Sequence, residues 1–210
     1  MDKGLALDNV KIAKGDQVLL RVSHQIAPGD VLTVMGPSGV GKSTLLSYIT
    51  GTLAPGFRAE GGVVLNGRDI AGLPPHARRV GILFQDDLLF PHLSVAENLA
   101  FGLRPGGDKS ERKKLISDAL SEIDLDGYED RDPATLSGGQ KARIALMRML
   151  LSEPAALLFD EPFSRLDSVL RSQVRSMVFA RARARALPIL MVTHDAEDAR
   201  AAGGDIIQLG

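Results

Sequence analysis

The residues most able to do chemistry begin with a glycine-rich octet at 36–43, which reads Gly-Pro-Ser-Gly-Val-Gly-Lys-Ser. An apolar, β-branched run at 31–35 precedes it, and a helical pattern starts near Lys42 and ends at Thr50. Glycine permits backbone conformations that are closed to other residues, so several N–H groups can converge on phosphate oxygens. The start of the helix also favours an anion. The pattern predicts a loop that binds the phosphates of a nucleoside triphosphate.

Each position of this loop has an expected role. Lys42 is predicted to reach the β- and γ-phosphates, and Ser43 is predicted to bind Mg²⁺. The strand before the loop and the helix after it disfavour the alternative, a tight turn with a surface lysine. The other expected nucleotide-binding positions are Gly36, Pro37, Ser38, Gly39, Val40, Gly41 and Thr44.

A second reactive pair stands at the end of the apolar run 156–159, where Asp160 and Glu161 follow directly. Side chains at the carboxyl ends of α/β strands face the crevice in which such sheets bind ligands. Asp160 is predicted to hold Mg²⁺, directly or through water, and Glu161 to polarise an attacking water. Two adjacent acids are unfavourable unless a metal and a phosphate compensate them, which disfavours a purely structural role.

Short apolar runs that alternate with longer helical stretches must position these residues. This alternation predicts an α/β fold, with a mainly parallel sheet flanked by helices as in P-loop NTPase cores. The first thirty residues are broken by Gly15 and by Pro28-Gly29, and they predict a small antiparallel β element ahead of that sheet. The expected strands of the main sheet lie at 31–35, 63–65, 80–84, 156–159 and 188–192.

The middle of the chain has a different character. Between about 88 and 153 little strand pattern remains, and three helical stretches are separated by Arg104-Pro105-Gly106-Gly107 and by Asp132-Pro133. We therefore expect one domain, 1–210, in which 1–87 and 154–210 form the catalytic core and 88–153 form an inserted helical subdomain.

Composition limits the possible functions. The chain has 210 residues, 25 basic and 26 acidic side chains and a net charge of −1, which gives no electrostatic basis for binding nucleic acid. Cysteine is absent, which excludes disulfides, thiolate metal sites and a cysteine nucleophile. No apolar run approaches the ~18 residues of a membrane span, and the first residues lack a secretory signal pattern. We expect a cytoplasmic protein.

A third motif, Leu-Ser-Gly-Gly-Gln, occupies 136–140 between the two reactive clusters. Ser137 and Gln140 have the spacing of a capping box that starts a helix. Capping does not explain Gly138 and Gly139, which we expect to be an exposed pair that lowers helix stability. A glycine-rich helix start is another place where an anion can bind.

Together with Gln85 and His194, this motif makes the chain resemble the nucleotide-binding subunits of ABC transporters, over essentially its whole length. The resemblance implies that Gln85 contacts Mg²⁺ or the attacking water and that His194 senses the γ-phosphate of ATP. It also implies that Asp167 communicates across a dimer. In such a dimer, segment 137–140 of one copy closes over the γ-phosphate held by the other copy. Two ATP molecules would be sandwiched head to tail, with a second copy of this chain as the default partner.

One position departs from the family pattern. The family usually stacks adenine on an aromatic residue that lies just before a glycine near the start of the chain. Here that position is Lys14, and Ile12 and Ala13 are not aromatic either. The hypothesis for this chain is that Lys14 lies over the base as a cation.

The resemblance also implies a transport role. The segments 89–98 and 160–164 are similar to those of ATPases that power importers of small solutes and ions, including the YnjD-like group. The implied partners are transmembrane permease subunits, which would hold the chain at the inner face of the membrane, and an extracytoplasmic solute-binding protein. The alternative is a soluble ABC-type ATPase with a role outside transport, such as cofactor assembly. A P-loop kinase would not account for the motif at 136–140 or for His194.

Overall fold

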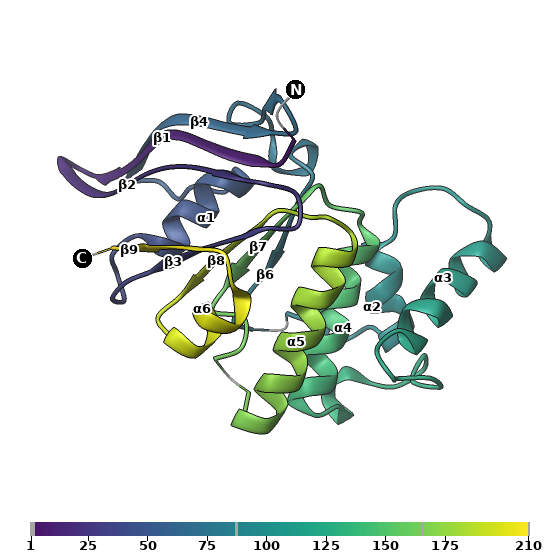
Figure 1. Cartoon of the computed structure of the whole chain (residues 1–210). Helices are drawn as coiled ribbons and strands as arrows, with labels where there is room; N and C mark the ends of the chain where they lie inside the picture. Colours follow the sequence, from purple (N-terminus) through teal and green to yellow (C-terminus); the bar gives the residue numbers. More distant parts are fainter. Residues whose placement is uncertain (1–2, 87, 165, 210) are drawn as a thin grey trace. The chain divides into compact units, whose positions relative to one another are not determined.

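The structure is a computed structural model that describes residues 3–86, 88–164 and 166–209. It divides into two compact units. The α/β unit comprises Met1–Ile82, Ala155–Glu161 and Arg175–Gly210, and the helical unit comprises Leu83–Pro154 and Pro162–Val174. Figure 1 labels most of the helices and strands of both units.

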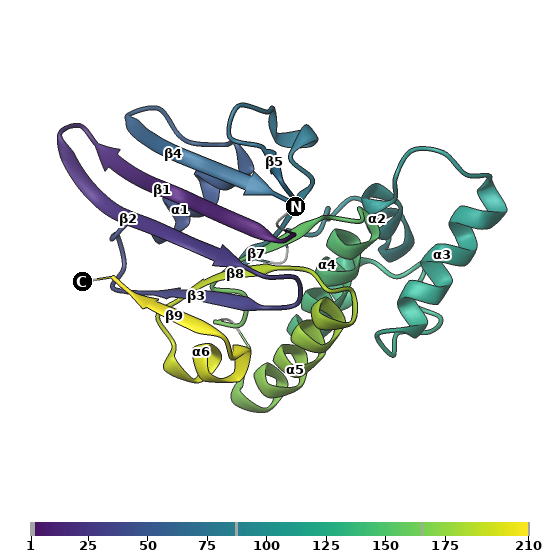
Figure 2. The same cartoon turned by 45° about the horizontal axis from the view of Figure 1, so that its top comes forward.

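An antiparallel sheet in the α/β unit contains the N-terminal β element. Its strands are β1 (Leu5–Lys14), β2 (Gln17–Ile26), β4 (Phe57–Leu65) and β5 (Arg68–Asp69), in the order β2-β1-β4-β5 (Figure 2). In β1, Leu7 and Val10 are both buried, although they are three residues apart. Asn9 lies between them with a φ of 49°, and a register shift there brings the apolar side chains back to one face.

The predicted strand 63–65 is present, but it belongs to β4 of the antiparallel sheet and not to the parallel sheet. Val63 and Leu65 are buried, whereas Val64 between them is only half-buried. This alternation is typical of a strand with one covered face. A run of three apolar residues is too short to show which sheet the strand joins.

The second sheet consists of β3 (Val31–Met35), β6 (Val80–Leu83), β7 (Ala156–Asp160), β8 (Ile189–Thr193) and β9 (Asp205–Gln208). Its order is β6-β7-β8-β3-β9, and the pairs β7–β8, β8–β3 and β3–β9 are parallel. Every residue of β8 is buried. The mainly parallel sheet predicted from the sequence is therefore confirmed, with β9 as a further strand.

Helix α1 (Lys42–Thr50) has the predicted bounds and links the two sheets through the core of the α/β unit. Its buried residues Leu45, Leu46 and Ile49 pack in one cluster with residues of both sheets. Gly51 ends the helix with a φ of 81°, as expected of a C-terminal glycine. Helix α6 (Ala196–Ala202) packs on β3 and β8.

The helical unit contains α2 (Val95–Gly102), α3 (Lys109–Ser121) and α4 (Gly138–Leu151), and α4 packs against the other two. A complete capping box starts each of these helices. Helix α5 (Ser168–Ala184) begins in the helical unit and ends in the α/β unit. Two short 3₁₀ helices lie at Pro75–Ala77 and Pro133–Thr135.

Among the residues that the structure describes, none of the helices combines the length and the apolar character needed to cross a membrane.

Candidate active site at the carboxyl ends of three strands

The glycine-rich loop connects β3 to α1, as predicted. Gly39 and Gly41 have φ angles of 84° and 102°, which lie in the left-handed region that favours glycine. A side chain at Gly41 would also be crowded, because an added Cβ would lie 3.2 Å from side-chain atoms of Leu19 and of Leu20. Pro37, Ser38 and Gly39 are exposed. The loop thus presents an exposed backbone turn at the N-terminal end of α1.

Lys42, the first residue of α1, is almost fully buried, with 6% of its surface exposed. Its ammonium group donates hydrogen bonds to the carbonyl oxygens of Gly36, at 2.6 Å, and of Pro37, at 3.0 Å. These bonds hold the positive charge inside the curve of the loop. An anion that approached the loop would meet this charge together with the start of α1.

Two oxygen donors meet beside the loop. The Ser43 hydroxyl lies 3.0 Å from the Asp160 carboxylate, so the start of α1 is joined to the end of β7. Burial is the main cause that raises the pKa of Asp160, and nearby Glu161 raises it further, whereas the hydrogen bond from Ser43 and the charge of Lys42 lower it. A hydroxyl and a desolvated carboxylate at this separation are the hard oxygen ligands that Mg²⁺ prefers.

The side chains of Glu161 and His194 are in close contact, which the sequence did not predict. His194 Nδ1 lies 2.5 Å from Glu161 Oε2. The Glu161 side chain is only 18% exposed, whereas that of His194 is 61% exposed. Glu161 also has a φ of 49°, which is uncommon for a residue other than glycine, and its backbone N–H donates to the Val192 carbonyl at 3.0 Å. Strained backbone of this kind is held only when its surroundings require it.

The segment that follows His194 is fixed by short-range hydrogen bonds. The Asp195 N–H donates to the Thr193 hydroxyl at 3.0 Å, and the Asp195 carboxylate accepts from the N–H groups of Glu197 and Asp198 at the start of α6. Asp195 is therefore the N-cap of a helix, a residue that sequence analysis missed. The signal was present, since Asp195 is followed by acids two and three positions later.

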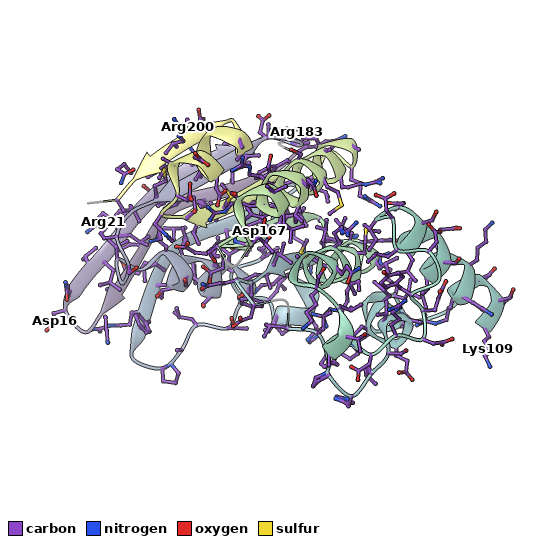
Figure 3. The ribbon with its side chains drawn as sticks, turned by 90° about the horizontal axis from the view of Figure 1, so that it is seen from below. Asp16, Arg21, Lys109, Asp167, Arg183 and Arg200 are labelled. Carbon is purple, nitrogen blue, oxygen red and sulfur yellow. The ribbon has the colours of Figure 1, made fainter. Side chains whose placement is uncertain are left out.

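The remaining predicted site residues lie in the helical unit. Gln85 is exposed in the bend that follows β6. Asp167 directly precedes α5 (Figure 3), and its carboxylate accepts the N–H of Leu170 at 3.1 Å. A capping function for Asp167 is thus visible in this structure.

The predicted capping box at the start of α4 is present. Ser137 Oγ accepts the N–H of Gln140 at 3.3 Å, and Gln140 Oε1 accepts the N–H of Ser137 at 2.9 Å. Gln140 also donates to the Tyr128 hydroxyl at 3.2 Å. The start of α4 is thus tied to the preceding loop of the helical unit.

The expectation of an exposed Gly138-Gly139 pair is half wrong. Gly138 is exposed, but Gly139 is buried. A Cβ on Gly139 would overlap the side chain of Leu170 in α5, whereas one on Gly138 would make only ordinary contact with Leu166. Close packing of α4 on α5 therefore accounts for Gly139 and leaves Gly138 unexplained by packing.

Lys14 ends β1 and is exposed. Its ammonium nitrogen lies 5.6 Å from the centroid of the Phe57 ring. This neighbour could not be predicted from the sequence, because the contact depends on the pairing of β1 with β4.

Comparisons with known proteins identify the family to which this chain belongs. A model of the ABC transporter family matches residues 19–164. The chain is 48% identical over 195 residues to the uncharacterized ABC transporter ATP-binding protein YnjD of Escherichia coli, covering 92% of this chain and 90% of the relative. It is 43% identical over 184 residues to the thiamine import ATP-binding protein ThiQ of Aliivibrio fischeri, covering 87% and 77% of the two chains.

The fold has a solved counterpart in CbiO1 of Clostridium perfringens, part of the ABC transporter complex CbiONQ. The TM-score is 0.85 at 27% identity, and the match covers 99% of this chain and 85% of the other. The chain thus contains a glycine-rich loop suited to phosphate, acidic residues at the end of a strand, and a glycine motif at a capped helix start. Its sequence and its fold both match one family. This chain belongs to the ABC transporter family, as an ATP-binding subunit that hydrolyses ATP.

Proposed function

We propose that this ATPase couples ATP binding and hydrolysis to the import of a solute through a membrane permease. The observation that supports the catalytic part most directly is a convergence of strand ends. β7, β8 and β3 are neighbours in the parallel sheet, and they lead into Asp160-Glu161, His194 and the glycine-rich loop respectively. Charged and hydroxyl groups thus gather at one sheet edge of the α/β unit, where such sheets bind ligands.

In this proposal, the backbone of residues 36–44 holds the phosphates of ATP, and Lys42 neutralises the β- and γ-phosphates. Ser43 and Asp160 would hold Mg²⁺, and the resemblance adds Gln85 as a further ligand. A divalent cation held by these residues would offset the negative charge that develops during phosphoryl transfer.

For hydrolysis, we propose Glu161 as the general base. Water forms a bond to the γ-phosphorus as its bond to the bridging oxygen breaks, ADP leaves, and the Glu161 carboxylate accepts the proton from the water. His194 Nδ1, at 2.5 Å, would fix the orientation of that carboxylate. Because Glu161 is also fixed at its backbone by β8, the base would be positioned before ATP binds.

We also propose that two copies assemble head to tail. Segment 137–140 of one copy would close over the γ-phosphate bound to the loop of the other, and Asp167 would lie at the contact between the copies. Exposed Gly138 supports this assembly, because packing within the chain does not require glycine there. The two copies would bind ATP on closing and separate after hydrolysis.

The proposed contact with the permease lies on the helical unit. Leu88 and Phe101 are large apolar residues with 54% and 70% of their surface exposed, and Leu88 follows Gln85 by three residues. Exposed apolar side chains in the segment that follows Gln85 would suit a cytoplasmic helix of the permease. The name of the thiamine import relative supports import, and such a system would include an extracytoplasmic solute-binding protein. The solute would be selected by those other subunits.

The experiment that tests the transport role is purification of the tagged chain from detergent-solubilised membranes of its own host. We expect a multi-span permease to co-purify in a fixed ratio, and Phe101→Ser to lose it without changing ATP hydrolysis in the purified subunit. Leu115→Ser is the matched control, because Leu115 is also an exposed apolar residue, 49% exposed, on α3. Recovery of the chain only with soluble proteins would support the alternative, an ABC-type ATPase that acts outside transport.

A further inference from the structure

Helix α6 directly follows the His194 segment, and a buried ion pair joins this helix to α5. Arg175 Nη1 lies 3.0 Å from Asp198 Oδ1. The Asp198 side chain is only 2% exposed, and that of Arg175 is 16% exposed. Both residues belong to the α/β unit. A carboxylate at this depth is unfavourable without a cation beside it, so Arg175 compensates a buried charge that the proposed reaction does not use.

Helix α6 depends on its neighbours for stability. It has seven residues, which is well below the roughly 12 residues at which isolated helices become stable in water. The apolar residues that it buries are Ala199 and Ala202, whose side chains are single methyl groups. The carbonyl of Ala202 also accepts a hydrogen bond from the Arg183 guanidinium of α5. Two arginines of α5 thus contact α6, Arg175 near its start and Arg183 at its end.

The ion pair is connected to His194 through the start of α6. The Asp195 carboxylate accepts the N–H of Asp198, and the Asp198 carboxylate in turn contacts Arg175. Because the His194 side chain is 61% exposed, packing around its ring contributes little to its position. Its contact with Glu161 therefore depends on where the backbone places residue 194, between the end of β8 and the start of α6.

We propose that Arg175 is a positioning residue for ATP hydrolysis, which through Asp198 holds α6 in place and keeps His194 beside Glu161. The proposal rests on the roles of Glu161 and His194 in the proposed function. A displacement of about 1 Å at a reacting group can lower a rate by about a hundredfold, even when the altered residue is far from the chemistry. Residues 36–44, which would hold the phosphates, follow a different strand, β3. Loss of the ion pair should therefore lower turnover and leave ATP affinity nearly unchanged.

The first test follows the ring of His194 by NMR in the whole chain. The protein has four histidines, and the signals of His194 are those absent from His194→Gln. Arg175→Met removes the charge but keeps a long apolar stem. In this variant the His194 signals should move toward those of a free imidazole, while those of His76 and His92 stay in place. Asp198→Asn should cause a smaller shift in the same direction, and Arg175→Lys should restore most of the normal position.

Unmoved His194 signals in both Arg175→Met and Asp198→Asn would overturn the proposal. So would equal shifts of all four histidines in the milder variant, Asp198→Asn, because that result would show a general loss of structure.

The second test is a double-mutant cycle on MgATP hydrolysis. Arg175→Met should lower kcat by about tenfold to a hundredfold with a nearly normal KM. In a His194→Ala background it should have little further effect, because the group that it positions is already absent. The same loss in both backgrounds would indicate a merely structural role and overturn the proposal. Normal turnover in His194→Ala alone would refute the role of His194 in the proposed function, and this proposal with it.

Arg200→Met is the matched control. Arg200 lies on α6, as Asp198 does, but it is exposed and donates to the Ala196 carbonyl of the same helix at 3.2 Å. The variant should leave the His194 signals and kcat unchanged. Effects as large as those of Arg175→Met would show that α6 responds to any change of its charges, and would contradict a specific role for the buried ion pair.

Discussion

The starts of α1 and α4 are both glycine-rich, but their backbone N–H groups differ in whether side chains of the same chain cap them. A helix leaves its first N–H groups without partners inside the helix. At α4, the Ser137–Gln140 capping box satisfies two such groups, one in each direction. At α1, the N-cap is Gly41 with a φ of 102°, and no side chain of the described residues makes a capping hydrogen bond there.

The first N–H groups of α1 can therefore accept a ligand as their hydrogen-bond partner, whereas the start of α4 is capped by side chains of its own chain. The open N–H groups at α1 stand beside the buried charge of Lys42, so an anion would satisfy the backbone and the ammonium group together. The start of α4 is stable without a ligand and can act as a preformed surface for a second molecule.

The largest effect is expected from Glu161→Gln, because Glu161 is the proposed general base. ATP turnover should fall by about a hundredfold to ten-thousandfold, while ATP still binds. Glu97→Gln makes the same exchange in the capping box of α2, outside the residues proposed for catalysis, and it should leave turnover nearly unchanged, since Gln also completes a capping box. Steady-state hydrolysis and nucleotide titration would measure both. Normal turnover in Glu161→Gln would remove Glu161 as the base.

Lys42→Ala should weaken ATP binding by about a hundredfold. The variant lacks the ammonium group of the loop that would bind the β- and γ-phosphates. Lys113→Ala removes the same charge from an exposed position on α3 and should leave affinity unchanged. Calorimetric titration of both variants gives the comparison. Similar affinities for the two variants would contradict a direct contact between the charge of Lys42 and the phosphates of ATP.

Gly138→Ala and Gly139→Ala should change stability in opposite directions. Alanine at 139 would overlap Leu170 and should lower the free energy of unfolding by about 1–3 kcal/mol. Alanine at 138 meets only ordinary contact, and it should raise that free energy by up to about 1 kcal/mol, since alanine favours helix. Urea denaturation would measure both variants. A stable Gly139→Ala protein would contradict the close packing of α4 on α5.

The smallest effect concerns Asp160. Since its pKa is raised, the folded protein binds this proton more tightly than the unfolded chain, and the free energy of unfolding falls as pH rises through the interval between the two pKa values. Asn keeps an oxygen that can accept from Ser43 but carries no charge. With EDTA present at pH 7, Asp160→Asn should therefore raise Tm by about 2 °C.

The difference in Tm between Asp160→Asn and the unaltered protein should shrink as pH falls below that interval. The same variant should bind MgATP more weakly. A lower Tm at pH 7 would show that the carboxylate stabilises the fold by itself.

Local patterns in the sequence were enough for much of the fold. The bounds of α1 followed from Lys42 after a glycine turn and from Gly51 at its end, and the capping box at Ser137 was visible from its spacing. The assignment of 63–65 to the parallel sheet was wrong, because pairing partners depend on contacts between residues far apart in the chain.

The same limit applies to the site. Asp160 and Glu161 could be placed at a strand end from the sequence, but the 2.5 Å contact of Glu161 with His194 depends on β7 and β8 being neighbours. The burial of Gly139 required Leu170, and the position of Phe57 beside Lys14 required the register of β1 with β4. Sequence patterns identified residue types at element ends, and long-range packing determined which of them meet.

In the proposed dimer, the open start of α1 in one copy is completed by the capped start of α4 in the other. Gly138→Asp should fold normally, because the position is exposed and an acid in the first turn stabilises a helix. Its carboxylate would nevertheless repel the γ-phosphate bound to the other copy. Lys42→Ala and Gly138→Asp should each be inactive alone. In an equal mixture, half of the dimers contain one intact loop facing one intact signature, so ATP hydrolysis should recover to about a quarter of normal. A mixture that stays inactive, although both variants are folded and associate, would contradict a site shared between two copies.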